Sequence, residues 1–250
     1  MDKVKLLLER LDAIGASLAK REGALALLGL GSCGLETARM DQYSDLDFFA
    51  IVEDGQQANY LADLSWLSDI APVAYAFRNT RDGFKLLYED GIFCEFAVFD
   101  HSQLAGIPYP EGRIVWQAQR FDPAIFQPAT KQPEPKTAEF LLGEALTNLY
   151  VGLGRFHRGE KRAAFRFIQG YAVDRVIDLA PHLETEQPAD VDLYDSDRRF
   201  EQRFPTVAAQ LPSMVLGDDE SPASAKAILT FLDAHFEVNM AMKLAILELC

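Results

Sequence analysis

The sequence lacks the features that mark membrane, secreted and zinc-finger proteins. No run approaches the roughly 18 consecutive apolar residues of a membrane helix. The first residues form an amphipathic pattern without the apolar core and cleavage site of a signal peptide. The three cysteines are far apart and show no CxxC spacing, which argues against a zinc site or a disulfide framework. We therefore expect a cytoplasmic protein with reduced thiols and no membrane partner.

Basic charge is also scarce. The chain has 24 Lys and Arg against 38 Asp and Glu, so its net charge is −14. Because a nucleic-acid surface needs clustered Lys and Arg, we expect no nucleic-acid partner. Of the 250 residues, 49% are hydrophobic, which is enough for a buried core in one or two domains.

Hydrophobic periodicity predicts a mixed first half. Helical spacing covers residues 3–20 and 57–70. Apolar runs typical of strands occur at 24–30, 46–52, 73–77, 84–88, 92–99 and 113–118.

The second half is predicted to be helical. Four prolines between Asp122 and Lys136 indicate an extended linker. Beyond it, long helices are predicted at 138–156, 162–179 and 223–249, the last with Ser221 as its N-cap. We thus predict an α+β fold in three parts: an N-terminal mixed β-sheet domain with flanking helices (1–121), a Pro-rich linker (122–136) and a C-terminal helical bundle (137–250).

Two aspartates mark the start of one predicted strand. Residues two apart in a strand point the same way, so Asp45 and Asp47 share one face while Leu46 and Phe48 occupy the other. Further along, the acidic face becomes apolar. The two carboxylates should therefore lie at the mouth of a buried strand, where a substrate can reach them.

A third acid, Glu95, interrupts the apolar run Phe93–Phe99. An unpaired carboxylate in such surroundings costs several kcal/mol unless a cation neutralises it. If this strand lies beside the strand of Asp45 and Asp47, the three carboxylates converge as metal ligands. Hard oxygen ligands suit Mg²⁺, and two ions about 4 Å apart would clamp an in-line displacement at phosphorus.

A glycine-serine turn follows the first predicted strand. Gly31 and Ser32 stand where a strand ends at a helix start, and there free N–H groups and the serine hydroxyl can bind a phosphate. Gly31 allows close approach because it has no Cβ. The combination of Gly-Ser, Asp-x-Asp after twelve intervening residues and a strand glutamate favours a nucleotide-binding catalytic site.

The same turn also fits the motif of a dinucleotide-binding fold. Residues 29–34 match GxGxxG, and Glu53 lies nineteen residues further, where a dinucleotide-binding fold places an acid for the ribose. The segment 35–44 is short and mostly polar, however, and does not predict the amphipathic helix that such a fold needs.

Five basic residues cluster in the helical half: Arg155, Arg158, Lys161, Arg162 and Arg166. Cations near a helix N-terminus oppose the helix dipole, and a bound anion would relieve that cost. One hypothesis is that Arg158, Lys161 and Arg162 hold the triphosphate tail or the leaving pyrophosphate across an interdomain cleft. A solvated basic face paired with nearby acids explains the cluster equally well.

The pattern of Gly-Ser, Asp-x-Asp and a later strand Glu resembles the nucleotidyltransferase fold of polymerase-beta-like enzymes. The strings at 41–48 and 91–96 are most similar to lincosamide nucleotidyltransferases, which inactivate lincomycin-type antibiotics, with weaker likeness at 140–142, 148–149 and 158–160. This resemblance implies a domain that carries Mg²⁺ and ATP. It makes Asp45 and Asp47 metal ligands, Ser32 a phosphate contact and Glu95 the general base, and it makes a homodimer plausible.

We therefore expect a Mg²⁺-dependent enzyme that moves AMP or another nucleoside monophosphate from a nucleoside triphosphate to a hydroxyl of a small antibiotic-like acceptor. Pyrophosphate would leave. The alternatives are an aminoglycoside or toxin-type nucleotidyltransferase and, outside enzymes, a nucleotide-binding regulatory module. Loss of one of the three acids would favour the module, and all three are present.

Overall fold

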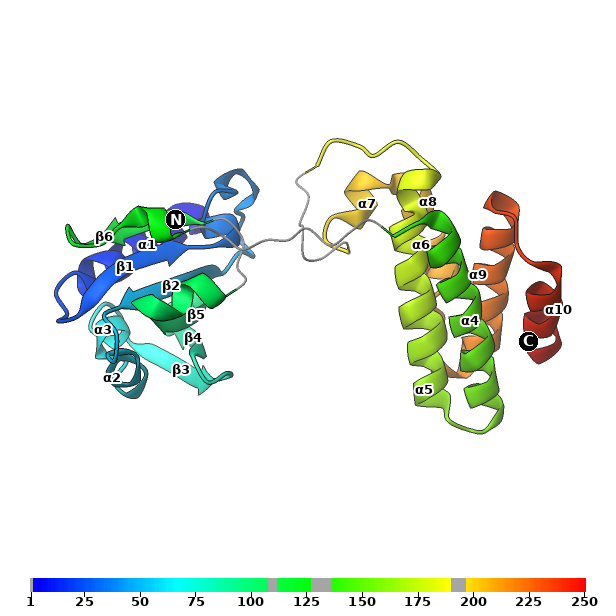
Figure 1. The fold of residues 1–250 in the computed structure, drawn as a ribbon, viewed down its shortest axis with the longest axis horizontal. Coiled ribbons are helices and arrows are strands. Elements are labelled where there is room, and N and C mark those ends of the chain that lie inside the picture. Colours follow the sequence, from blue (N-terminus) through cyan, green and yellow to red (C-terminus); the bar gives the residue numbers. More distant parts are fainter. Residues whose placement is uncertain (1, 108–111, 127–135, 190–196) are drawn as a thin grey trace. The chain divides into compact units, whose positions relative to one another are not determined.

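The computed structural model describes residues 2–107, 112–126, 136–189 and 197–250. The chain divides into two compact units, Met1–Lys131 and Gln132–Cys250, which we call the α/β unit and the helical unit (Figure 1). The boundary falls within the predicted linker 122–136, of which residues 127–135 lie outside the described residues.

A mixed sheet of six strands forms the centre of the α/β unit, in the order β3-β4-β5-β2-β1-β6. The β2–β5 pair is parallel, whereas β1–β2, β1–β6, β3–β4 and β4–β5 are antiparallel. The strands match the six predicted runs to within one or two residues: β1 (Ala24–Gly29), β2 (Leu46–Val52), β3 (Val73–Arg78), β4 (Gly83–Tyr88), β5 (Phe93–Asp100) and β6 (Arg113–Gln117). The predicted α+β class is therefore confirmed.

Alternation along β2 and β5 separates an apolar face of the sheet from a polar one. Phe48 of β2 stacks on Phe96 of β5, with ring centroids 5.2 Å apart, and both rings belong to the main core of the unit. A slip of one residue would bring the neighbouring acids into that core. The aromatic pair therefore fixes the register and directs Asp47 and Glu95 to the opposite face.

Helix α1 (Lys3–Leu18) packs against the apolar face, as its spacing predicts. Asp2 caps it by accepting a hydrogen bond from the Val4 N–H at 3.1 Å. The helix contributes to the core through one stripe of fully buried residues: Leu7, Leu11, Ile14 and Leu18.

The single helix predicted at 57–70 is wrong. It is divided into α2 (Gln57–Ala62) and α3 (Ser65–Ser68). Asp63 is extended between them, and its carboxylate accepts hydrogen bonds from the N–H and the hydroxyl of Ser65 at 2.9 and 3.0 Å. Aspartate side chains compete with helical hydrogen bonds in this way, so the chain ends one helix and starts another.

The helical unit packs around α4 (Ala138–His157). A continuous helical stretch follows it, made of α5 (Lys161–Phe165), a π-helical segment (Arg166–Ala172) and α6 (Val173–Leu179). The other α-helices that the structure describes in this unit are α7 (Phe200–Arg203), α8 (Pro205–Ala208), α9 (Ser221–His235) and α10 (Met240–Leu249).

The long helix predicted at 223–249 is interrupted. It ends at His235 and starts again at Met240, where the Asn239 side chain accepts a hydrogen bond from the Met242 N–H at 3.2 Å. Ser221 is the first residue of α9 and not its N-cap. It is buried, and its hydroxyl donates to the Asp218 carbonyl at 3.0 Å. None of the described helices has the length and apolarity to span a bilayer.

Candidate active site

The turn after β1 is tied to the start of β2. The Leu30 N–H donates to the Asp47 carbonyl at 2.8 Å. The chain then forms a 3₁₀ turn over Gly31–Cys33 in place of the expected helix start, and Gly31 has a φ of +52°, where glycine is favoured. The N–H groups of Cys33 and Gly34 close this turn at 3.1 Å each. The hydrogen bonds of the turn do not use the N–H groups of Gly31 and Ser32, although Ser32 is buried.

The dinucleotide-binding alternative is wrong for this turn. Strands β1 and β2 are antiparallel, and the chain between them contains a 3₁₀ turn (Thr37–Arg39) where that fold has a crossover helix. A GxGxxG motif needs a parallel βαβ unit to aim a helix N-terminus at the pyrophosphate.

Two of the three predicted acids are direct neighbours across the sheet. In the parallel pairing of β2 with β5, Asp47 stands opposite Glu95. Paired residues on strands about 4.8 Å apart point to the same face, so the two side chains lie side by side. Asp45 lies directly before the first residue of β2, and Asp47 is the second residue of that strand. The expectation that the strand of Glu95 lies beside the strand of Asp47 is confirmed.

Glu95 has a second neighbour, which the sequence analysis missed. Lys85 of β4 stands opposite Glu95 in the antiparallel β4–β5 pairing, and its ammonium lies 3.0 Å from Oε2 of Glu95. Asn79, directly after β3, donates from Nδ2 to Oε1 of Glu95 at 3.3 Å. A lysine within the apolar run 84–88 was the signal for this partner, because that run has no other charged residue.

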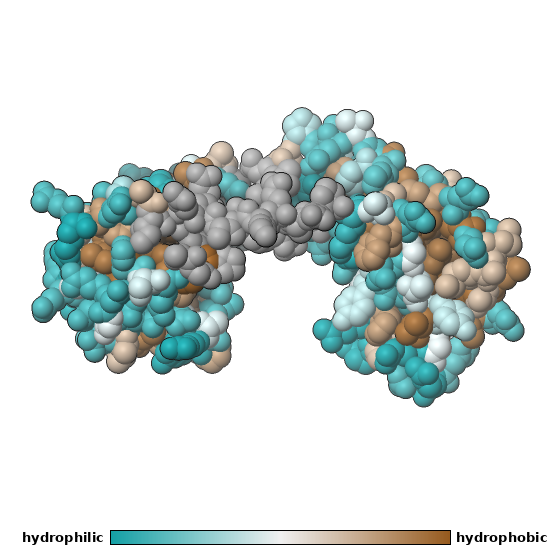
Figure 2. Space-filling model, in the orientation of Figure 1, coloured by the Kyte–Doolittle hydropathy of each residue, from teal (hydrophilic) through white to brown (hydrophobic). Residues whose placement is uncertain are grey.

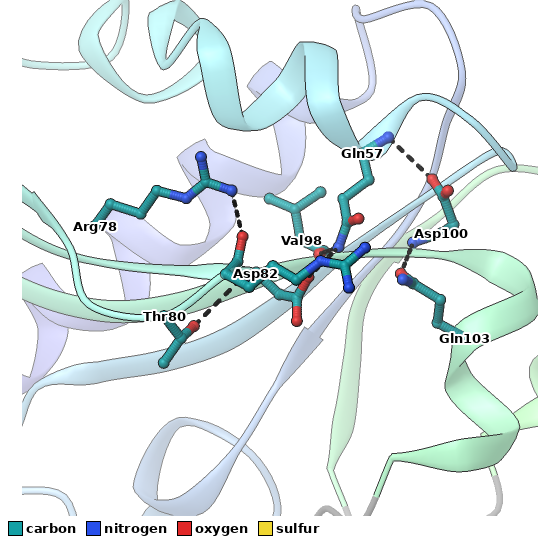
Figure 3. Close-up of polar contacts among 8 residues, drawn as sticks. Gln57, Arg78, Thr80, Asp82, Val98, Asp100 and Gln103 are labelled. Carbon is teal, nitrogen blue, oxygen red and sulfur yellow. Dashed lines mark hydrogen bonds and ion pairs between the residues drawn. The ribbon is translucent and has the colours of Figure 1, made fainter.

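The β3–β4 turn that carries Asn79 is held by polar contacts at the far end of β5 (Figure 3). The Gln57 side-chain amide donates to Asp82 at 2.9 Å and to the Val98 carbonyl at 2.7 Å. The hydroxyl of Thr80 accepts from the Asp82 N–H at 3.3 Å. Asn79 is thereby presented to Glu95 from a turn that is anchored to both α2 and β5.

Asp45, Asp47 and Glu95 concentrate negative charge near the starts of β2 and β5. The buried Cys33 thiol donates to the Asp47 carbonyl at 2.8 Å. Burial, together with the nearby carboxylates of Asp47 and Asp45, raises the pKa of Cys33 to about 11. Burial also raises the pKa of Cys94, and the same two carboxylates contribute. A cation bound at these carboxylates would offset their negative charge.

The donors fit a divalent cation in their chemistry. Carboxylate oxygens from adjacent strands are hard ligands of the kind that Mg²⁺ takes, and the surrounding field is negative. The side chains themselves are not gathered around one point. In the part of the chain that the structure describes, no three His, Cys, Asp or Glu side chains lie close enough to hold a metal ion. The Glu95 carboxylate is engaged with Lys85 and Asn79.

The basic cluster of the helical unit is partly neutralised. Glu160 accepts from Arg155 at 3.3 Å and from Arg158 at 3.2 Å, and Lys161 pairs with Asp219. This pairing with Asp219 raises the pKa of Lys161. The phosphate contacts predicted for Arg158, Lys161 and Arg162 stay a prediction.

Arg162 and Arg166 differ from the rest of the cluster. Both are exposed, and neither forms an ion pair with any described residue. They line a surface cavity of about 670 Å³ together with Lys161, Phe167 and Tyr171. Arg162 is therefore the predicted phosphate contact whose charge is still available.

No protein-family model matches the chain, and no curated protein sequence matches it. Among solved structures, the chain is similar to an aminoglycoside 6-adenyltransferase from Bacillus subtilis. The identity is 12%, the match covers 97% of this chain and 90% of that chain, and the TM-score is 0.37. A TM-score this low does not establish a common arrangement, so the interpretation of the site rests on its own geometry.

Proposed function

We propose that the protein is a metal-dependent nucleotidyltransferase that moves a nucleoside monophosphate, AMP from ATP, onto a hydroxyl of a small molecule. One observation carries the proposal. Asp47 and Glu95 are in register on adjacent parallel strands, and the backbone of Asp47 is tied to the turn that contains Gly31 and Ser32. Carboxylates for a divalent cation and N–H groups for a phosphate thus come from neighbouring strand ends.

Each residue has a role in this proposal. Asp45 and Asp47, with Glu95 beside them, would hold Mg²⁺, which supplies positive charge to the reacting phosphate oxygens when it is bound. The Gly31–Ser32 turn and the Ser32 hydroxyl bind the phosphates. Arg162, Arg158 and Lys161 stay proposed phosphate contacts of the helical unit, and Arg162 is the one of the three without an ion pair among the described residues.

The reaction is a displacement at the α-phosphorus. The acceptor hydroxyl oxygen forms a bond to that phosphorus, the bond to the β-phosphate bridging oxygen breaks, and pyrophosphate leaves with the electron pair. Glu95 takes the proton of the hydroxyl as general base. In the structure Glu95 is partly exposed, with 43% of its side-chain surface accessible, so an acceptor hydroxyl can reach it.

For the acceptor we propose a small antibiotic-like molecule. The sequence strings at 41–48 and 91–96 favour a lincosamide, and an aminoglycoside is the second candidate. The proposed homodimer stays a prediction.

The test is an assay of transfer. The full chain is incubated with ATP, Mg²⁺ and a panel of lincosamides and aminoglycosides, and mass spectrometry follows the formation of an acceptor–AMP adduct while pyrophosphate is measured in parallel. We expect equal amounts of adduct and pyrophosphate with at least one acceptor. The Asp47→Asn variant should give neither product, and Asp12→Asn, an exposed acid on α1, should behave like wild type. ATP binding without adduct on any acceptor would favour the regulatory module instead.

A further inference from the structure

Three charged side chains form one row across the sheet. Lys85 of β4 stands opposite Glu95 of β5, and Glu95 stands opposite Asp47 of β2. All three positions point to the face that lies opposite the Phe48–Phe96 stack. The row contains one lysine, at its β4 end, followed by two neighbouring carboxylates, Glu95 and Asp47.

The central glutamate is the member that both neighbours influence. Like charges directly opposite each other on adjacent strands are destabilising, so the carboxylates of Asp47 and Glu95 repel each other. Lys85 offsets this through its contact of 3.0 Å with Oε2, and Asn79 donates to Oε1. Each oxygen of Glu95 therefore has a partner that offsets the repulsion from Asp47: Lys85 at Oε2 and Asn79 at Oε1.

We propose that Lys85 is the resident counter-ion of this site. Its ammonium holds the Glu95 carboxylate while no divalent cation is bound, and Glu95 exchanges Lys85 for the cation when one binds beside Asp47. Lys85 is thus a positioning residue that competes with the metal for Glu95. The inference rests on the metal site of the proposed function.

Two features of the structure support the exchange. Lys85 is 41% exposed and Glu95 43% exposed, so both side chains can separate into solvent at little cost. The second feature is that both oxygens of Glu95 are engaged, by Lys85 and by Asn79, so the carboxylate has to leave Lys85 before it can bind a cation. Release from Lys85 is the step that would free Glu95 to join Asp47.

An ordinary cross-strand ion pair is the alternative, and it makes a different prediction. Such a pair stays closed when a cation binds, so its loss weakens the β4–β5 hairpin equally with and without metal, and its lysine affects metal affinity only through charge repulsion that salt screens. A competing lysine must affect both quantities, in opposite directions: its removal weakens the metal-free fold and strengthens metal binding.

The experiment measures Mn²⁺ binding to the full chain, without nucleotide, by calorimetry or electron paramagnetic resonance. We expect Lys85→Met to bind Mn²⁺ about fivefold more tightly than wild type, which is the scale of a partly exposed ion pair. Lys85→Arg keeps the charge and should stay close to wild type. Lys5→Met removes the lysine of an exposed pair with Glu9 on α1 and serves as the matched control.

Thermal unfolding in EDTA gives the second readout. Lys85→Met should unfold at a lower temperature than both wild type and Lys5→Met, and saturating Mn²⁺ should remove the difference. Mn²⁺ affinity of Lys85→Met equal to or weaker than that of wild type would overturn the inference. If Asp47→Asn nevertheless abolishes Mn²⁺ binding, the metal site of the proposed function stands. Absence of Mn²⁺ binding in both wild type and Lys85→Met would overturn both.

Discussion

The two units of the chain use their charged side chains in different ways. In the α/β unit, acids and a lysine line up in register across the sheet, with positions set by strand pairing. In the helical unit, Arg155 and Arg158 share Glu160 on an exposed surface. Strand pairing holds side chains in fixed rows, whereas long side chains on helix surfaces are free to reorient.

The two units also differ in how many large hydrophobic side chains they expose. The α/β unit exposes four large hydrophobic residues among those described: Leu35, Tyr43, Tyr75 and Phe77. The helical unit, which shows brown patches in Figure 2, exposes nine such residues among those described: Phe140, Tyr150, Val151, Tyr171, Val215, Leu216, Met240, Leu244 and Leu247. This difference fits the proposed function, in which the α/β unit carries the chemistry and the helical unit contributes contact surface.

The largest expected effect tests this division directly. Asp47→Asn should lower the turnover number for nucleotidyl transfer by about a thousandfold, because it removes a charge on which cation binding depends. Arg162→Glu in the helical unit should raise the Michaelis constant for ATP about tenfold and leave the turnover number almost unchanged. Steady-state kinetics with varied ATP separates the two effects, and circular dichroism checks that both variants are folded.

The proposed division of roles between the two units is wrong if the two variants have the same effect. A turnover number within a factor of about three of wild type in Asp47→Asn would remove the metal role. An unchanged Michaelis constant in Arg162→Glu would leave the basic cluster as a solvated surface.

A second prediction asks whether the units unfold separately. Gly152 on α4 faces Ile168 of the π-helical segment, and a Cβ at this position would lie 2.5 Å from Ile168 Cγ1. Gly152→Ala should therefore destabilise the helical unit by about 1–2 kcal/mol, even though alanine favours helices. Both tryptophans, Trp66 and Trp116, belong to the α/β unit. The helical signal in circular dichroism should shift on heating, while tryptophan fluorescence should not.

The matched control is Gly143→Ala on the same helix. A Cβ there meets nothing within 4 Å, so the variant should be as stable as wild type or up to about 1 kcal/mol more stable. A fluorescence transition that moves together with circular dichroism in Gly152→Ala would show that the two units unfold as one.

The smallest expected effect concerns pH. Partial burial and the charge of Asp197 raise the pKa of Asp174 on α6. A raised pKa means that the stability present below the unfolded value of about 3.9 is lost as pH rises through the folded value. Asp174→Asn should hence raise the unfolding temperature by about 1 °C at pH 7, and the gain should vanish near pH 3.

Asp178→Asn, in the same helix, should change stability at pH 7 in the opposite direction. Asp178 pairs with Arg175 at 3.1 Å, so its neutralisation should lower stability slightly at pH 7. If both variants changed stability in the same direction at pH 7, burial would not be the cause of the shift at Asp174.

Much of the architecture was predictable because its signals are local. The alternation around Asp47 and Phe48 gave both the strand and its polar face, and the spacing of Leu7, Leu11 and Ile14 gave α1. The breaks were missed for an equally local reason. Asp63 and Asn239 end or start helices through their own side-chain hydrogen bonds, and hydrophobic periodicity does not register such contacts.

The sequence by itself determined which face of each strand carries the acids, because side-chain direction alternates along any strand. It also placed a glycine where the chain after β1 turns with a positive φ. Only the tertiary structure decided that β5 pairs with β2 in the register that sets Glu95 opposite Asp47, and that Lys85 and Asn79 reach Glu95 from β4 and from the end of β3. Strand order and register depend on contacts between segments far apart in the chain, such as the Phe48–Phe96 stack, and no local pattern contains them.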